Sequence, residues 1–127
     1  MGDVQVLGSI LEKLDEVVPV AKTLLNSTSS AYEASRQVKQ ANGVLYGLSG
    51  YNSKGSAQFI QVHDATTLPA AGAVPKVVVA VAAQANFSVD FGASGRQFNV
   101  GILVCNSSTG PTLTVGSADC WLDVQYL

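Results

Sequence analysis

Charged side chains are scarce over most of this 127-residue chain, and their scarcity argues against nucleic acid as a partner. Positions 1–39 hold 9 of them and positions 40–127 hold only 7, with a net charge of -2. Proteins that bind nucleic acid neutralise phosphates with clustered Lys and Arg. The 7 basic residues of this chain are scattered instead, so we expect no nucleic-acid partner.

Histidine, cysteine and long apolar runs are also in short supply. His63 is the single histidine, and Cys105 and Cys120 do not have the CxxC spacing of a metal site, so we expect no metal and no cofactor. The longest apolar run, residues 77–83, is too short to span a membrane, and the first residues lack the pattern of a signal peptide. We therefore expect no membrane partner and a chain made in the cytoplasm, where cysteines are usually buried thiols. A disulfide between the two cysteines remains an alternative only if the fold brings their Cα atoms within about 7 Å.

The first third of the chain has charge and a helical pattern of apolar residues. A heptad-like spacing over about three heptads predicts an amphipathic helix. Its apolar seam consists of Val4, Leu7, Ile10, Leu11, Leu14, Val17, Val18 and Leu25. The seam is broader than a two-stranded coiled coil needs, which indicates three or more associated helices or an anchor on a larger body. The alternative is a helix that folds onto its own domain.

Two features divide this arm, which we predict to cover residues 1–42. Pro19 kinks or splits a helix because it lacks a backbone donor, so a coiled coil and a helical hairpin both remain open. The segment Ser30-Ala-Tyr-Glu33 resembles a capping box and predicts a short helix over residues 30–41. Its solvated face would then carry Glu33, Arg36 and Lys39.

From position 43 onward the helical period disappears, and clusters of Gly, Ser, Asn and Pro separate short apolar runs. These runs predict seven strands, at residues 44–48, 57–63, 76–82, 87–91, 98–105, 112–115 and 120–126. Several short strands without intervening helices are typical of an antiparallel sandwich. The predicted fold is therefore mainly β: an antiparallel β-sandwich or jelly-roll-like domain at residues 43–127, preceded by an N-terminal α-helical arm.

Apolar residues out of phase mark possible interfaces. The strand predicted at 98–105 alternates toward a core, which leaves Leu103 and Cys105 on its other face. Trp121 is likewise out of phase with Leu122. We expect the helical arm or another subunit to cover such residues. Arg96, in a nearly uncharged domain, either pairs with Asp90 or a neighbouring chain or lies on a solvated hairpin tip.

Five segments of the β-domain together resemble a family of small, mostly uncharacterised structural proteins of tailed bacteriophages. The resemblance covers about 80 residues and leaves out residues 1–41. It rests on Leu45-Tyr-Gly-Leu-Ser-Gly-Tyr-Asn-Ser53, Ala57-Gln-Phe-Ile-Gln-Val-His-Asp64, Leu68-Pro-Ala-Ala-Gly-Ala-Val-Pro75, Gly101-Ile-Leu-Val-Cys-Asn-Ser-Ser-Thr-Gly-Pro111 and Ala118-Asp-Cys-Trp-Leu-Asp-Val-Gln-Tyr126. The resemblance implies a virion component and supplies no catalytic residues.

Residues that could carry chemistry favour structural roles instead. The pair His63-Asp64 ends a predicted strand, where neighbouring side chains face opposite ways, and no serine lies in a nucleophile elbow. Asp90, Asp119 and Asp123 do not have the spacing of a calcium loop and favour capping or solvation. We therefore expect no enzyme activity.

These observations predict a virion accessory protein, made in the host cytoplasm. The most favoured role is a homotrimeric capsid decoration, cement or head-fibre subunit whose partners are itself and the major capsid protein or other virion proteins. The alternative is an adhesin-like fibre module that binds a host-surface glycan. Its aromatic contacts would come from Tyr46, Tyr51, Trp121 and Tyr126, although such residues more often pack in a core or an interface.

Overall fold

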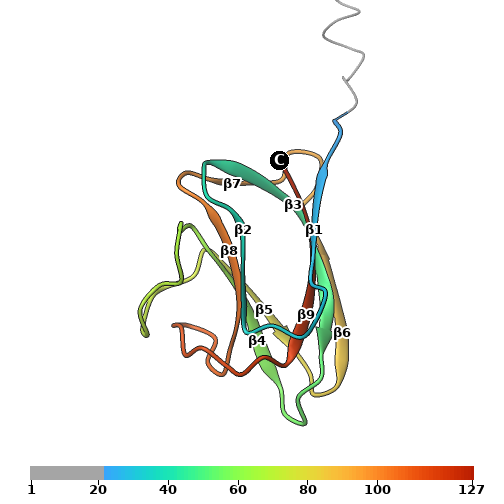
Figure 1. The fold of residues 1–127 in the computed structure, drawn as a ribbon, viewed down its shortest axis with the longest axis vertical. Helices are drawn as coiled ribbons and strands as arrows, with labels where there is room; N and C mark the ends of the chain where they lie inside the picture. The colour runs from blue at the N-terminus through green and yellow to red at the C-terminus, as the bar shows by residue number, and fades with distance from the viewer. Residues whose placement is uncertain (1–21) are drawn as a thin grey trace, which may run out of the picture.

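The computed structural model describes residues 22–127, in which nine strands form two facing antiparallel layers (Figure 1). In chain order the strands are β1 (Leu25–Thr28), β2 (Ser35–Lys39), β3 (Gly43–Asn52), β4 (Gln58–His63), β5 (Val77–Val81), β6 (Ala85–Asp90), β7 (Arg96–Phe98), β8 (Ile102–Ser107) and β9 (Cys120–Tyr126). The described part of the chain is therefore mainly β, as the spacing of turn residues predicts.

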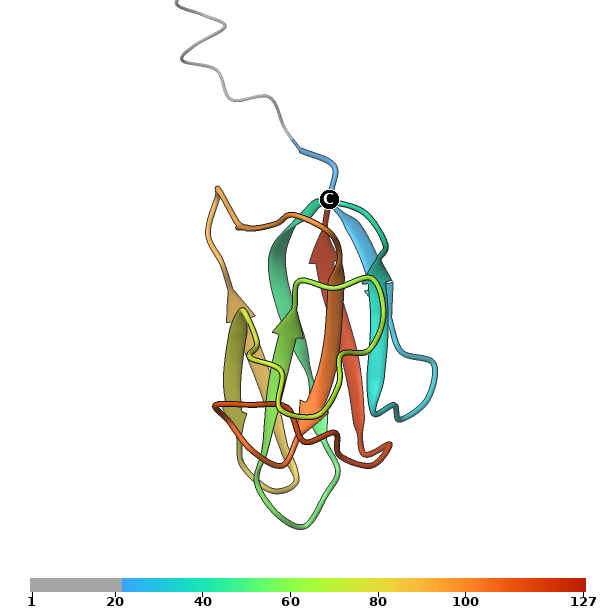
Figure 2. The ribbon, with the colours of Figure 1, turned by 90° about the vertical axis from the view of Figure 1, so that its left-hand side faces the viewer.

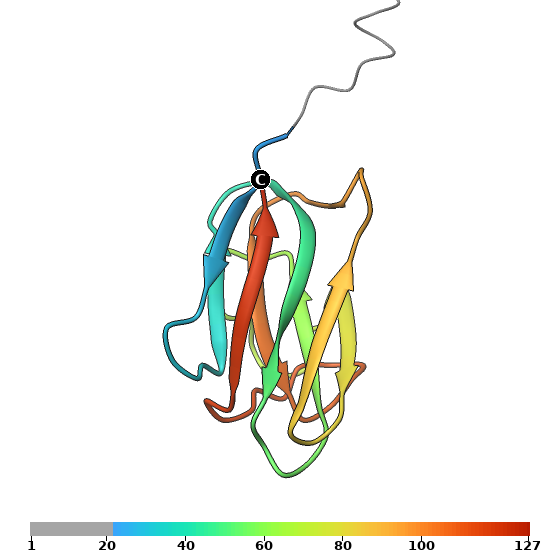
Figure 3. The ribbon, with the colours of Figure 1, turned by 90° about the vertical axis from the view of Figure 1, so that its right-hand side faces the viewer.

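Each layer is one antiparallel sheet. Sheet I has the strand order β1-β9-β3-β6, and β7 also pairs with the first residues of β3 (Figure 3). Sheet II has the order β2-β8-β4-β5 (Figure 2). The described part begins and ends at the same end of the sandwich, where the backbone N–H of Val44 donates to the carbonyl of Leu127 over 2.9 Å (Figure 1).

Alternating residues of both sheets form the core. In β9, Cys120, Leu122 and Val124 are fully buried, whereas Trp121 is exposed on the opposite face. In β6, Phe87 is likewise buried, whereas its neighbours Asn86 and Ser88 are exposed. The period of two in these sequences therefore predicts the inward face correctly, because successive side chains of a strand point to opposite sides.

The short helix predicted over residues 30–41 is wrong, and residues 25–42 belong to the sandwich. Strand β1 pairs with β9, and β2 pairs with β8. Between them, the backbone N–H groups of Ser29 and Glu33 donate to the carbonyls of Leu122 and Cys120. Pairing with distant strands therefore overrides the local capping-box pattern. Leu25, the last residue of the predicted seam, lies in β1 opposite Tyr126; the other seam residues, between Val4 and Val18, lie outside the described residues.

The predicted strand at 98–105 is two strands in different sheets. Strand β7 ends at Phe98 in sheet I, and β8 begins at Ile102 in sheet II. Between them Val100 is 50% exposed rather than in the core. At this crossing, a side chain on Gly101 would collide with the backbone of Ala65.

Sheet II is covered on its outer side by the chain itself. The predicted strand at 112–115 is a loop with one isolated bridge from Ser107 to Val115. Leu113 in this loop packs with Ala73 on Leu103 and Cys105. The loops that follow β4 and β8 both cross in front of sheet II in Figure 2. The second apolar face of β8 thus needs neither the helical arm nor another subunit to cover it.

Candidate functional site

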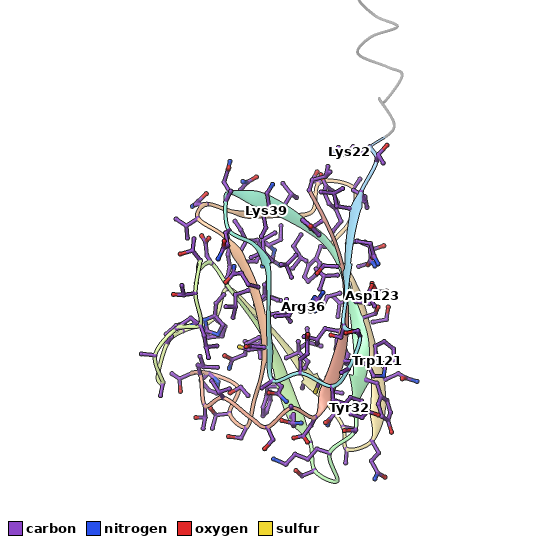
Figure 4. All side chains as sticks on the ribbon, viewed as in Figure 1. Lys22, Tyr32, Arg36, Lys39, Trp121 and Asp123 are labelled. Atoms are coloured by element: carbon purple, nitrogen blue, oxygen red, sulfur yellow. The ribbon has the colours of Figure 1, made fainter. Side chains whose placement is uncertain are left out.

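The outer face of sheet I is a regular grid of polar and aromatic side chains. Strand pairing sets three rows: Trp121, Tyr51 and Asn86; then Thr28, Asp123, Ser49 and Ser88; then Asn26, Gln125, Gly47 and Asp90. Successive rows are two residues apart along each strand, or about 7 Å. We call this grid the outer face; Trp121 and Asp123 lie on it in Figure 4.

One end of the outer face is aromatic. The rings of Tyr51 and Trp121, which lie opposite each other in the ladder, stack with centroids 6.4 Å apart and planes 28° apart. Beside them, Trp121 and Tyr32 line a hollow of about 380 Å³, together with residues 29–31. Trp121 is 38% exposed and Tyr32 is 49% exposed. Ring surface is therefore available to a ligand at this end.

The other end of the outer face is a shallow groove of about 560 Å³. Lys22 donates from Nζ to the Tyr46 hydroxyl over 2.9 Å and lies 5.0 Å from the centre of that ring. Asp90, which also lines the groove, accepts the backbone N–H of Gly92. At the floor of the groove, a side chain on Gly47 would contact the Gln125 amide, so the glycine leaves the groove open.

Hydrogen bonds fix the polar side chains between the two ends. Thr28 Oγ1 donates to Asp123 Oδ1 over 2.9 Å, and Gln125 Nε2 donates to the same oxygen over 3.2 Å. Gln125 Nε2 also donates to Asn26 Oδ1 over 2.8 Å. The remaining oxygen of Asp123, Oδ2, accepts no hydrogen bond from the described residues, so it is free to accept one from a ligand.

His63 and Asp64 hold loops in place and do not form a catalytic pair. His63 Nε2 donates to Gln61 Oε1 over 2.8 Å, and Gln61 Nε2 contacts the carbonyls of Thr109, Gly110 and Thr112. This network secures the loop that covers sheet II. Burial lowers the pKa of His63 below its ordinary value, which favours the neutral ring.

Asp64 fastens the crossing between the two sheets. Its Oδ1 accepts the backbone N–H groups of Val100 and Gly101, and its Oδ2 accepts that of Asn99, over 2.8 to 3.1 Å. Desolvation alone would raise the pKa of this carboxyl. The three backbone donors and the charge of Lys76 outweigh desolvation and lower the pKa.

The two cysteines are free, buried thiols in different clusters. Cys105 packs on the outer side of sheet II with Leu103, whereas Cys120 belongs to the main core. Burial raises the pKa of Cys105 to about 12 and also raises that of Cys120. Both thiols are therefore protonated at neutral pH, which makes them poor nucleophiles.

The three residues that the sequence marks as possible interfaces differ in how far they are exposed. Leu103 is 2% exposed beneath the chain's own loop, so it is not available to another subunit. Arg96 is exposed, and its guanidinium lies 5.7 Å from the centre of the Phe91 ring rather than in an ion pair with Asp90. Trp121 remains exposed on the outer face. Tyr32 has no signal of its own in the sequence, because it falls in the segment predicted to be helical.

The solvated helical face predicted for Glu33, Arg36 and Lys39 is also wrong. Arg36 donates to Glu33 Oε1 and to Ser27 Oγ, each over 2.8 Å, and lies between β1 and β2 in Figure 4. Ser29 donates to the other oxygen of Glu33. These bonds link the first edge strand of sheet I to that of sheet II.

Residues 22–127 contain no group of three or more His, Cys, Asp or Glu side chains placed to hold a metal ion. Nor does any helix in this part of the chain have the length and apolarity needed to cross a membrane. Comparisons with protein-family models, with curated proteins and with solved structures found no match to the chain.

Proposed function

We propose that this protein is a non-catalytic accessory component of a tailed-phage particle, a capsid decoration, cement or head-fibre subunit. Its N-terminal segment would join the particle or two further copies of the chain, and its sandwich would be displayed. The major capsid protein, another virion protein or the chain itself would be the partner.

The position of Lys22 carries this proposal. The described chain starts at the end of the sandwich where Leu127 also lies, and the outer face of sheet I runs away from that end (Figure 3). A partner held by the preceding residues would thus meet the groove end of the sandwich and leave the aromatic end of the outer face, around Trp121, accessible (Figure 4). The heptad-like pattern of residues 4–18 supports this arrangement, because an apolar seam needs a partner surface.

Further support comes from the chemistry of the buried groups and from the resemblance of the β-domain to phage structural proteins. His63 and Asp64 are used in loop contacts, and the two thiols are protonated, so none of these four groups is an activated nucleophile. A role in assembly needs none.

Two measurements test the proposal with the full chain. Light scattering on a sizing column gives the native mass, and co-sedimentation with particles that lack this protein gives binding. We expect a trimer that binds the particles with saturation. Absence of binding to such particles by the wild-type protein would rule the proposal out.

The seam is tested by a charge placed within it. Leu11→Asp should abolish trimer formation or particle binding, because the apolar partner surface would desolvate the new carboxylate without a partner. Lys13→Asp introduces the same side chain at a position outside the seam, and should retain most of the binding. In both variants the thermal unfolding of the sandwich, followed by the emission of Trp121, should stay that of the wild type.

A further inference from the structure

The aromatic end of the outer face has the features of a ligand site rather than of packing surface. Tyr32 and Trp121 border a hollow, and each retains more than a third of its surface in solvent. Tyr51 stacks against Trp121 and so supports the indole from one side. Such an aromatic surface costs little to order when a ligand binds, because it is already held in place.

Hydrogen-bonding groups lie beside this aromatic surface. Asp123 is in the next row of the grid, about 7 Å along β9, and its Oδ2 is free among the described residues. The hydroxyls of Ser30, at the hollow, and of Ser49, beside Asp123, make no side-chain hydrogen bond within the described part. A ligand that covers the ring of Trp121 could therefore also bond to fixed polar groups.

We infer that the outer face of sheet I binds a neutral glycan, with one sugar ring in the hollow between Tyr32 and Trp121. A pyranose has an apolar face of C–H groups, which packs on an aromatic ring, and an edge of hydroxyls, which bonds to carboxylates and hydroxyls. The aromatic end and the polar rows supply both surfaces in adjacent positions. The groove at Tyr46 and Gln125 extends the same face for further sugar units.

Composition and charge favour a glycan over a protein partner. The cores of protein interfaces are depleted in Asp and Ser, yet Ser49, Ser88, Asp90 and Asp123 occupy the outer face. Charge narrows the choice further, because Asp123 beside the aromatic end and Asp90 in the groove outnumber Lys22, the single cation among the described residues of the grid and the groove, so the face as a whole disfavours acidic sugars. The ligand class is therefore a neutral oligosaccharide.

Trp121 is the single tryptophan of the chain, so its fluorescence reports directly on this site. The full-length protein would first be screened on an array of neutral and acidic glycans. The strongest neutral oligosaccharide would then be titrated while the emission of Trp121 is recorded. We expect saturable binding with a change in emission, and no binding of acidic glycans. A screen without saturable binding, or one with only acidic binders, would overturn the inference.

Substitutions locate the site. Tyr32→Ala and Tyr51→Ala keep the fluorescent reporter, and each should weaken binding about 3-fold or more; Trp121→Ala, measured by calorimetry, should weaken it at least about 10-fold. The matched control is Val78→Ala, which removes an exposed side chain from sheet II and should bind as the wild type does. Thermal unfolding checks that each variant is folded. Equal affinity in wild type and Trp121→Ala would contradict the proposed site.

Self-association is the competing use of this face. It predicts that, without glycan, the emission of Trp121 changes with protein concentration even in Leu11→Asp, where the N-terminal seam is disrupted, and that result would overturn the inference. The glycan assay uses soluble protein, so its outcome is independent of whether the chain attaches to a particle.

Discussion

Replacement of Asp64 should destabilise the sandwich at the point where the chain passes from sheet I to sheet II. This carboxylate accepts three backbone N–H groups, from Asn99, Val100 and Gly101. A hydrogen bond to a charged group contributes about 1.5–3 kcal/mol when well buried. Because Asp64 is only partly buried, we assign less than 1 kcal/mol to each bond and expect Asp64→Ala to cost about 2 kcal/mol.

Asp64→Asn provides a graded comparison. In the wild type, Oδ1 of Asp64 accepts the backbone N–H groups of Val100 and Gly101, and the amide oxygen of Asn can still accept both. The NH₂ group of Asn, however, would face the backbone N–H of Asn99, so that hydrogen bond is lost. The loss should therefore be about half that of Asp64→Ala, or about 1 kcal/mol. Urea unfolding at pH 7 measures both values, and a melting temperature lowered by about 8–16 °C should accompany the alanine variant.

The pH dependence tests the same reasoning independently. Because the pKa of Asp64 is lowered in the folded state, its contribution is full above its ordinary value of 3.8. It is lost as the pH falls through the lower folded pKa. The gap between wild type and Asp64→Ala should thus shrink in strong acid. A variant within 0.5 kcal/mol of the wild type at pH 7, roughly the scatter of neutral surface substitutions, would refute this account of the crossing.

Three further substitutions probe the core and the loops. Burial lowers the pKa of His63 from 6.5, so the free energy of unfolding of the wild type should fall as the pH drops below about 6.5. In His63→Gln, urea unfolding should show a smaller change in this free energy between pH 7 and pH 5. Leu113→Ala should lower the free energy of unfolding by about 2 kcal/mol. It should also speed the reaction of Cys105 with a thiol reagent, because Leu113 covers that thiol, and an unchanged rate would mean that the loop does not protect Cys105. Gly50→Ala should lower the melting temperature, because the new Cβ on β3 would collide with the backbone carbonyl of Trp121 on the neighbouring strand β9. An unchanged temperature would show that the two strands can move apart.

The sequence predicts the sandwich well where one strand face is apolar and the other polar. Strand β9 is predicted at 120–126 and observed as Cys120–Tyr126, since its alternation matches the pleat residue by residue. Strand β3 is observed through Asn52, although the strand predicted from the sequence ends at residue 48. Its Gly and Ser residues resemble a turn locally, but β3 is paired with strands on both sides, and close approach by Phe87 requires the glycine at position 50.

Prediction fails where distant pairing decides the structure. Residues 30–41 have a helical start signal, yet their backbone groups bond to β9 and β8, which are more than 60 positions away. Local propensity carries no information on such partners. The candidate site has the same limitation: Trp121 could be marked as out of phase with the core, but its neighbours Tyr32 and Tyr51 follow only from the fold.

The fold and the outer face depend on different residues of the same strands. Along β9, Leu122 and Val124 point into the core, whereas Trp121, Asp123 and Gln125 point outward. The outer side of sheet II cannot vary in the same way, because Leu103 and Cys105 on that side are buried under the chain's own loop. Substitutions on the outer face of sheet I should therefore change ligand recognition with little loss of stability. Trp121→Ala, which removes a partly exposed side chain, should unfold within about 1 kcal/mol of the wild type. A larger loss would mean that the Tyr51–Trp121 stack is part of the folding core, and the outer face could not then vary independently of the sandwich.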